Sequence, residues 1–405
     1  MLVKLRQRFN PEPWERTLYI LFFVQLFTAV GYSSIFPFLP LYVAELGSAY
    51  GLKIELLAGW VFSAQAISMM IASPIWGNLA DRFGRKLMIQ RAQYGGAVLL
   101  TMMAFVQNAE QLVLLRGIQG LVTGTIAANS ALVAATAPRH RSGYAMGLLQ
   151  VGLGAGLAAG PLLGGALADA FSYHAAFYGT GLLLLISGLM VTLYIREPEQ
   201  IDPETRRKKS NMLKGWALIL RTPGVSATYG MRFMSRMARM MIVPILPLFI
   251  AALISDSERM NTFIGLVLGA FSAASTLSGI YLGRLGDRIG HRKVLLACLA
   301  AAGIAYLPQA LVGDAWHLLW LSALAGVAVG GVIPMISALL ANHIRQGDEG
   351  AAYGLDNSIA AAGRAAAPLV GSWIASMYGF RAVFTATAGV FFAAALYGIA
   401  FIPKE

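Results

Sequence analysis

The chain has 405 residues, of which 57% are hydrophobic and only 12% are charged, and its formal net charge is +12. Ordinary soluble domains carry about 25% charged residues, so this composition excludes a soluble globular protein. The single cysteine, Cys298, also excludes a disulfide within one chain.

Apolar stretches of roughly 20 residues follow one another along the chain, and each is long enough to cross a bilayer as a helix. The sequence therefore predicts an all-α polytopic membrane protein with twelve transmembrane helices, at 17–45, 56–80, 86–107, 110–137, 143–168, 174–196, 223–253, 261–283, 292–312, 316–343, 351–377 and 381–402. The longest polar interruption contains four consecutive basic residues, from Arg206 to Lys209. We expect an N-terminal six-helix bundle at 1–196, a cytoplasmic linker at 197–222 and a C-terminal six-helix bundle at 223–405.

Lysine and arginine concentrate on alternate connecting segments, beginning with the N-terminus. The segments of the other side hold only Lys53, Arg259 and Arg381. Because cytoplasmic loops carry the excess of basic residues, both termini are expected in the cytoplasm. The chain would be a multi-pass protein of the cell membrane, meaning the plasma or inner membrane. Its positive charge is explained by the inner surface and requires no nucleic-acid partner.

The two halves of the chain repeat each other. FPFLPLYVAEL at 36–46 matches VPILPLFIAAL at 243–253, and GPLLGGALADAFSYHAAF at 160–177 matches APLVGSWIASMYGFRAVF at 367–384. This pattern indicates an internal duplication with two pseudo-symmetric bundles. Parallel repeats about an axis along the membrane normal are a known transporter plan, with the substrate site near the midplane between them.

A charged loop follows the second span of each half. GNLADRFGRK occupies 77–86, and a related string, GRLGDRIGHRK, occupies 283–293. The first copy resembles the loop signature of the major facilitator superfamily, and the second is a degenerate version of it. The resemblance extends over the whole chain and implies that Asp81 bonds to the opposite half and helps to hold the outward-open state. The residues assigned to this latch are Gly77, Asp81, Arg82, Gly84, Arg85, Lys86 and Asp287. A basic loop that only sets the topology is the alternative.

The fifth span contains the sequence GLAAGPLLGG. It resembles the Gly-Pro element of the drug:proton antiporter branch of the same superfamily, and it implies a role for Gly156, Gly160, Pro161, Gly164 and Gly165. Small residues spaced four apart also permit close helix packing, which is the alternative explanation.

Two residues are candidates for coupling transport to protons. Arg116, in LRGIQG of the fourth span, resembles the arginine motif of that span in the superfamily, and an ionisable residue at membrane depth is a functional hypothesis by default. Asp356 is the candidate proton carrier by elimination, because acids inside the spans are scarce. A structural role near the interface of the halves is its alternative.

The seventh span departs from the pattern of pumps for lipophilic cations, because it carries arginines and no deep carboxylate. Arg232, Arg236 and Arg239 share one helix face, and Arg364 lies in the eleventh span. With the aromatic residues Tyr32, Phe36 and Phe233 they would line a substrate cavity that is basic and binds an anionic group. Alternatively, Arg232 extends to the inner surface and the others bond backbone carbonyls or Asp356.

These observations together predict a secondary active transporter, most simply a proton-coupled antiporter that exports drugs or amphiphilic small molecules by alternating access. An exporter or flippase of an anionic amphiphile, lipid or organic anion is the alternative. No catalytic cluster, metal-ligand spacing or phosphate loop is present in the sequence, so the chain is not expected to be an enzyme or to need a cofactor beyond the proton gradient. Members of this superfamily generally act as monomers in the lipid bilayer, and we expect the same here.

Overall fold

A computed structural model describes residues 12–195, 224–254, 259–343 and 349–402, and within these ranges the regular structure is helical. The first part of the chain forms α2 (Pro13–Ser34), α3 (Leu39–Leu46), α4 (Ile54–Phe83), α5 (Arg85–Met103), α6 (Ala109–Val122), α7 (Ile126–Thr136), the short 3-10 helix η1 (Arg139–Arg141), α8 (Ser142–Ala170) and α9 (Tyr173–Tyr194). The second part forms α11 (Val225–Met241), α12 (Leu246–Leu253), α13 (Met260–Ile289), α14 (His291–Tyr306), η3 (Pro308–Leu311), α15 (Ala315–Gly330), α16 (Val332–His343), α17 (Glu349–Tyr378) and α18 (Phe380–Phe401).

Four of the predicted spans are interrupted helices. The first and seventh spans break before α3 and α12, around Pro37 and Pro244, because proline lacks the backbone N–H that a continuous helix needs. The fourth span breaks between α6 and α7, where Gly124 has φ +134°, a conformation that other residues rarely adopt. The tenth span breaks at a single residue, Gly331, between α15 and α16. The sequence pattern had predicted each of these spans as one uninterrupted stretch.

Nine of the helical segments in the described ranges are long and apolar enough to cross a membrane. The predicted third, fourth and eleventh spans are not among them. These are α5 with Arg91 and Gln93, the pair α6–α7 with Arg116, and α17 with Asp356 and Arg364. Two of these three spans carry ionisable residues singled out above, namely Arg116 in the fourth and Asp356 with Arg364 in the eleventh.

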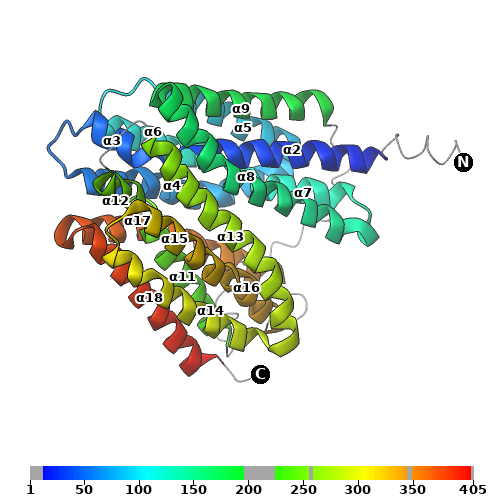
Figure 1. Ribbon diagram of the computed structural model, residues 1–405. Helices are drawn as coiled ribbons and strands as arrows, with labels where there is room; N and C mark the ends of the chain where they lie inside the picture. Colours follow the sequence, from blue (N-terminus) through cyan, green and yellow to red (C-terminus); the bar gives the residue numbers. More distant parts are fainter. Residues whose placement is uncertain (1–11, 196–223, 255–258, 344–348, 403–405) are drawn as a thin grey trace, which may run out of the picture.

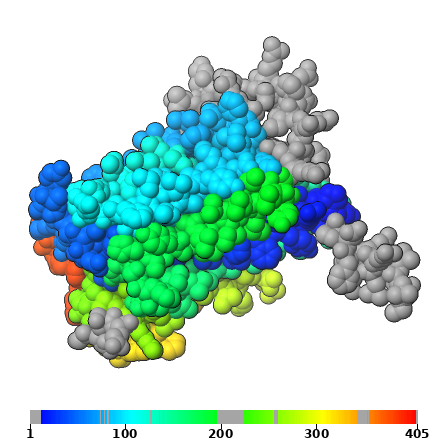
Figure 2. All heavy atoms as spheres, turned by 90° about the horizontal axis from the view of Figure 1, so that it is seen from above, coloured from blue at the N-terminus to red at the C-terminus, as the bar shows by residue number. Residues whose placement is uncertain are grey.

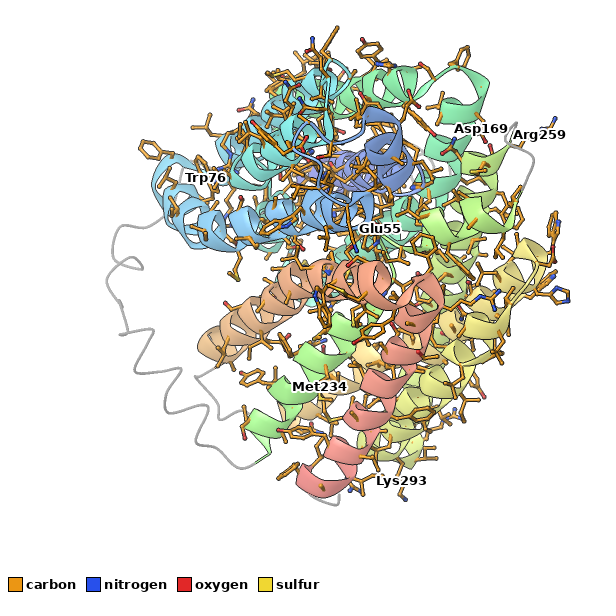
Figure 3. All side chains as sticks on the ribbon, turned by 90° about the vertical axis from the view of Figure 1, so that its left-hand side faces the viewer. Glu55, Trp76, Asp169, Met234, Arg259 and Lys293 are labelled. Atoms are coloured by element: carbon orange, nitrogen blue, oxygen red, sulfur yellow. The ribbon has the colours of Figure 1, made fainter. Side chains whose placement is uncertain are left out.

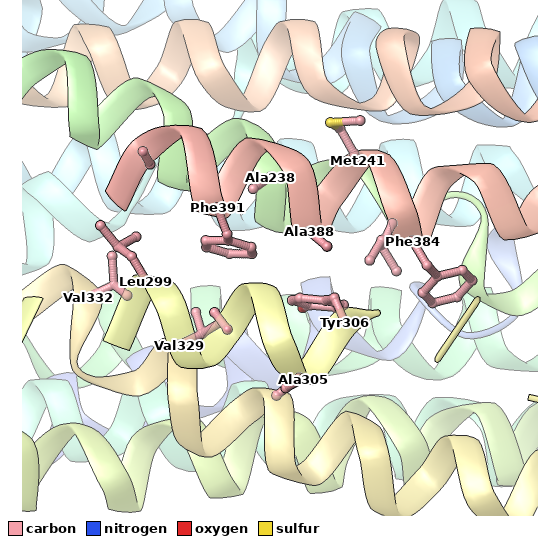
Figure 4. Close-up of a cluster of buried hydrophobic side chains, with 14 of the residues drawn as sticks. Ala238, Met241, Leu299, Ala305, Tyr306, Val329, Val332, Phe384, Ala388 and Phe391 are labelled. Carbon is pink, nitrogen blue, oxygen red and sulfur yellow. The ribbon is translucent and has the colours of Figure 1, made fainter. Parts of the chain in front are cut away.

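The helices form two groups, which we call the N-terminal group (α2 to α9) and the C-terminal group (α11 to α18) (Figure 1). Seen from above, the blue-to-green N-terminal group covers nearly the whole face (Figure 2). Each group buries an apolar core, and that of the N-terminal group also takes in Leu248 of α12. That of the C-terminal group gathers Tyr306, Phe384 and Phe391 with aliphatic residues of α14, α15 and α18 (Figure 4), and the rings of Tyr306 and Phe391 stack 5.6 Å apart.

The two groups meet along two seams, one between α8 and α13 and one between α4 and α17. They lie together at the end that carries the connections 47–53, 104–108 and 307–314, and they diverge toward the end that carries the chain termini (Figure 1). Following the distribution of basic residues, we call the first the outer end and the second the inner end. Alternation between these two ends is what the candidate site has to control.

Candidate transport site

The two charged loops have the same backbone design. Gly84 ends α4 and precedes α5 with φ +93°, and Gly290 ends α13 and precedes α14 with φ +102°. A side chain is strained at a positive φ, so glycine permits the chain to reverse within one residue. The sequence repeat is therefore also a repeat of local geometry at the inner end.

Two of the predicted latch residues bond within their own group. Arg85 donates from Nη1 to the carbonyl oxygen of Ala131 at 2.5 Å, and Lys86 donates to that of Thr192 at 3.1 Å. In the second loop, Asp287 is exposed and lies 3.1 Å from His291. The side chains of Asp81 and Arg82 fall outside the described part of the structure, so the contact across the two groups stays a prediction.

Gly77 and Gly283 occupy equivalent places near the inner ends of α4 and α13. Among the described residues, no atom lies within 4 Å of a Cβ atom added at either position. The absence of a side chain is thus unnecessary at both places in the observed arrangement. It would be required if the inner ends approached each other.

The glycines of α8 pack closely, as their spacing predicts, and their partner is α2. A Cβ atom at Gly156 would lie 2.8 Å from the carbonyl oxygen of Leu26, and one at Gly160 would lie 2.8 Å from that of Val30 and overlap the Ser33 hydroxyl. Gly164 meets the backbone of Ser34 in the same way. The Ser33 hydroxyl also donates to the carbonyl oxygen of Gly156 at 3.0 Å, which fastens the two helices together.

The other side of α8 packs on the C-terminal group. Gly165 lies against the backbone of Asn261, and the carbonyl oxygen of Pro161 lies against Gly265. Toward the inner end this contact fades: a Cβ atom at Gly154 would be 3.3 Å from Thr276, and one at Gly147 would meet nothing within 4 Å. Pro161 and Gly165 thus belong to the seam between the groups, whereas Gly156, Gly160 and Gly164 belong to the interior of the N-terminal group.

Arg116 is 1% exposed, so its predicted burial is correct. Its Nε donates to the carbonyl oxygen of Val61 at 3.2 Å, its Nη1 donates to Oε1 of Gln119 at 2.6 Å, and its guanidinium lies 5.8 Å from the ring centre of Phe62. Nη2 has no hydrogen-bond partner. No carboxylate compensates this charge among the described contacts.

A second cation of the N-terminal group was missed at the sequence level, because its position near a basic loop suggested an inner-surface residue. Arg91 of α5 stacks its guanidinium 3.4 Å from the ring centre of Trp76, and its three side-chain nitrogens are buried without a hydrogen-bond partner. Trp76 in turn donates to the carbonyl oxygen of Leu121, just before the break between α6 and α7. The arginine–tryptophan stack is a cation–π contact, which favours a desolvated cation.

Among the described residues, Asp356 is the only acid whose carboxylate bonds one of the buried arginines. Arg232 is 3% exposed, and its Nε lies 2.7 Å from Oδ1 of Asp356, while Nη2 donates to the Ser337 hydroxyl at 2.8 Å. One alternative expected Arg232 to extend to the inner surface, and this expectation is wrong. The pair ties α11 to α16 and α17 inside the C-terminal group.

The remaining arginines of the C-terminal group are not paired with acids among the described contacts. Arg236 packs its Cβ against Gly363 of α17, and its Nε is buried without a partner. Arg239 lies over the ring of Phe271 at 5.3 Å. Arg364 is half-buried. Arg232, Arg236 and Arg239, which were predicted to share one helix face, thus have three different environments.

The predicted aromatic residues divide between the groups. Tyr32 approaches Gly96 with its hydroxyl, which is buried. Phe36 packs on Phe62, with ring centres 5.7 Å apart, beside Arg116. Phe233 is half-buried and contacts Gly363 through its backbone. Tyr32 and Phe36 therefore belong with Arg116, and Phe233 with the arginines of α11.

Comparison with known proteins agrees with this arrangement. A family model described as the Major Facilitator Superfamily matches the chain twice, at residues 21–231 and 228–405. The chain belongs to the major facilitator superfamily. The two matches correspond to the two halves of the internal repeat.

Relatives within the superfamily resemble the chain over nearly its full length. The multidrug resistance protein MdtG of Dickeya zeae (strain Ech586) is 36% identical over 390 residues, which is 96% of this chain and 94% of that protein. MdtG of Salmonella typhimurium (strain LT2) is 34% identical over 387 residues, with 96% and 95% covered. The chain is therefore a membrane transporter and not an enzyme.

Solved structures of the superfamily have the same fold at low sequence identity. The nucleoside transporter NupG (D323A mutant) superposes with a TM-score of 0.81 at 15% identity, over 96% of this chain and all of that one. A bacterial homologue of the human lysosomal transporter Spinster gives 0.78 at 12% identity, with 96% and 97% covered. At such identities the comparison concerns the fold alone.

Proposed function

We propose that the chain is a proton-coupled antiporter of the cell membrane that exports drugs and other amphiphilic small molecules by alternating access. The observation that carries the mechanism is the graded packing along α8, which is tight at Gly165 and open at Gly147. Two rigid groups that touch at one end and part at the other can exchange these ends by rocking. The similarity to multidrug resistance proteins over 96% of the chain supports drugs as the substrates.

The proposal gives the sequence motifs distinct tasks. Residues 1–196 and 223–405 act as the two moving units, with 197–222 as a cytoplasmic linker and both termini in the cytoplasm. The charged loops hold the inner ends together in the outward-open state, with Asp81 as the bonding acid. Gly77 and Gly283 give the inner ends room to approach. Arg116 and Asp356 influence proton coupling, the protein works as a monomer, and the proton gradient is its energy source.

A second candidate function rests on the buried cations. The guanidiniums of Arg91, Arg116 and Arg236 each keep at least one buried nitrogen without a hydrogen-bond partner. An unpaired cation in a desolvated site is costly, and an anionic ligand would remove that cost. This favours export of an anionic amphiphile, and the charge of the substrate separates the two functions.

Purified protein in proteoliposomes tests both. An imposed pH gradient is followed with an entrapped pH dye while a lipophilic cation or a lipophilic anion is added. Dissipation of the gradient by the cation supports multidrug antiport and leaves the arginines a structural role. Dissipation by the anion alone, lost in Arg236→Ala, supports the second function.

No dissipation by either ion would contradict proton-coupled antiport. Asp81→Asn provides the matched test of the latch. We expect it to fold and to bind substrate but to lose transport, and a wild-type transport rate would contradict the role of Asp81.

A further inference from the structure

Two charged side chains at the outer end, those of Asp169 and Lys53, sit at the unfavourable end of their own helix. Asp169 lies in the last turn of α8, and Lys53 is the residue that precedes α4. The C-terminus of a helix carries partial negative charge and the N-terminus partial positive charge. Each side chain is therefore repelled by the helix to which it belongs.

Both side chains instead meet the favourable helix end in the opposite group. The Asp169 carboxylate lies at the start of α13, and Figure 3, seen from the outer end, shows it beside Arg259, which precedes that helix. Oδ1 accepts from the backbone N–H of Asn261 at 3.1 Å and from its side-chain amide at 2.7 Å. Oδ2 accepts from the backbone N–H and the hydroxyl of Thr262, both at 2.6 Å.

Asn261 and Thr262 are the second and third residues of α13, whose free N–H groups a helix normally satisfies with its own capping residue. The capping position of α13 is held by Arg259, which has no acceptor to offer and makes no capping bond. Within the described residues, the capping position of α13 thus offers no side-chain acceptor, and the N-terminal group supplies one through Asp169.

The other seam has the complementary contact. The Lys53 ammonium donates to the carbonyl oxygen of Ser376 at 3.0 Å, in the last turn of α17. Lys53 is exposed, so this contact is the weaker of the two. Asp169 is only partly buried and borders a cavity of about 300 Å³ shared with Glu45, His174 and Asn261, so water replaces its contacts readily when the seam opens.

We propose that Asp169 is a conformational positioning residue of the transport cycle, whose carboxylate caps α13 across the two groups and thereby keeps the outer end closed, with Lys53 as a weaker second contact. The bonds exist only while the outer ends touch. Their loss therefore favours the outward-open state without removing a group from either bundle core. This inference concerns the equilibrium between the two states and does not depend on which substrate is carried.

The test measures that equilibrium directly. Full-length protein in nanodiscs is spin-labelled in a Cys298→Ala background, either at the outer end through Tyr50→Cys and Leu311→Cys or at the inner end through Tyr194→Cys and Ile289→Cys. These four side chains are exposed. Pulsed electron paramagnetic resonance then gives the fraction of molecules in each state. For Asp169→Asn we expect an outward shift of about tenfold in the ratio of states, which corresponds to about 1.4 kcal/mol.

Asp314 provides the matched control. It caps α15 at the same outer end through the backbone N–H groups of Trp316 and His317, but within the C-terminal group alone. Asp314→Asn removes a negative charge from a helix start in the same way and should leave the ratio of states unchanged. An equal shift in both variants would show a general effect of losing a charge at a helix start and would overturn the proposal.

Two further variants keep the proposal testable if Asp169→Asn folds poorly. Thr262→Val removes one donor from the opposite group and should shift the ratio in the same direction by a smaller factor. In the double variant with Asp169→Asn the two shifts should not add, because both remove the same contact. Lys53→Met should shift the ratio by no more than about twofold. Additive shifts for Asp169 and Thr262, or no shift in either variant, would overturn the assignment.

Discussion

The buried pair of Arg232 and Asp356 allows the sharpest prediction of stability. Removing the carboxylate in Asp356→Ala leaves a guanidinium that is 3% exposed and retains only the Ser337 hydroxyl as a partner. Loss of one member of a buried ion pair costs about 3–5 kcal/mol, because the remaining charge stays desolvated. Replacing both members, in Arg232→Met with Asp356→Leu, should recover most of that cost, since apolar residues of similar volume need no partner.

Denaturant titration in detergent micelles measures these free energies of unfolding for the wild type, Asp356→Ala, Asp356→Leu, Arg232→Met and the double variant. The reasoning predicts a coupling energy of several kcal/mol between the two positions. A cost below about 1 kcal/mol for Asp356→Ala, or a double variant as unstable as the worse single one, would refute it.

The same double variant separates structure from coupling. If Asp356 carries the exchanged proton, the stable double variant binds substrate but does not use a pH gradient, and proteoliposomes containing it should show no gradient-driven export. Retained gradient-driven export by a folded double variant would assign Asp356 a structural role only.

Three further predictions use substitutions matched within one helix or one site. Gly160→Ala should cost about 1–3 kcal/mol through overlap with Ser33 and Val30, whereas Gly147→Ala, with open space around it, should be neutral or slightly stabilising in thermal unfolding; equal effects would contradict the packing described for α8. Gly77→Val should leave equilibrium substrate binding intact and reduce transport at least tenfold, because only the state with closed inner ends lacks room for the side chain; unchanged transport would argue against that closure. Arg116→Met should fold, since it removes a charge without a carboxylate partner. It should retain substrate exchange while losing gradient-driven transport. Retained gradient-driven transport would exclude a role of Arg116 in coupling.

Features that depend on composition and repetition could be predicted from the sequence. The helical membrane fold, the repeat of the charged loops and the burial of Arg116 follow from apolar length, duplicated strings and a lone charge inside an apolar span. The close packing of Gly156 and Gly160 also follows, because glycines four residues apart align on one helix face. Periodicity could not name α2 as their partner, since it describes one helix at a time.

Features that depend on contacts distant in sequence were not predictable in this way. Arg91 lies five residues beyond Lys86 in a basic region and is not among the candidates of the sequence analysis, although stacking on Trp76 holds its guanidinium in a buried site. Asp169 is not among the candidates of the sequence analysis, because nothing in its sequence neighbourhood indicates its bonds to the start of α13. One signal was available in retrospect: an acid at the C-terminal end of a helix is unfavourable locally and therefore suggests a partner elsewhere.

The distribution of charge connects these contacts to alternation between states. The buried pair of Arg232 and Asp356 lies within one rigid unit and changes little when the units rock. The charged side chains at the seams, Asp169 and Lys53, bond across the units, so the same motion makes or breaks their contacts. The outer closure thus combines buried apolar contacts, such as that of Leu248 with the N-terminal group, with a few partly hydrated polar contacts at helix ends. Such contacts can be replaced by water at low cost, which keeps the two states within a few kcal/mol of each other, as a transporter that visits both requires.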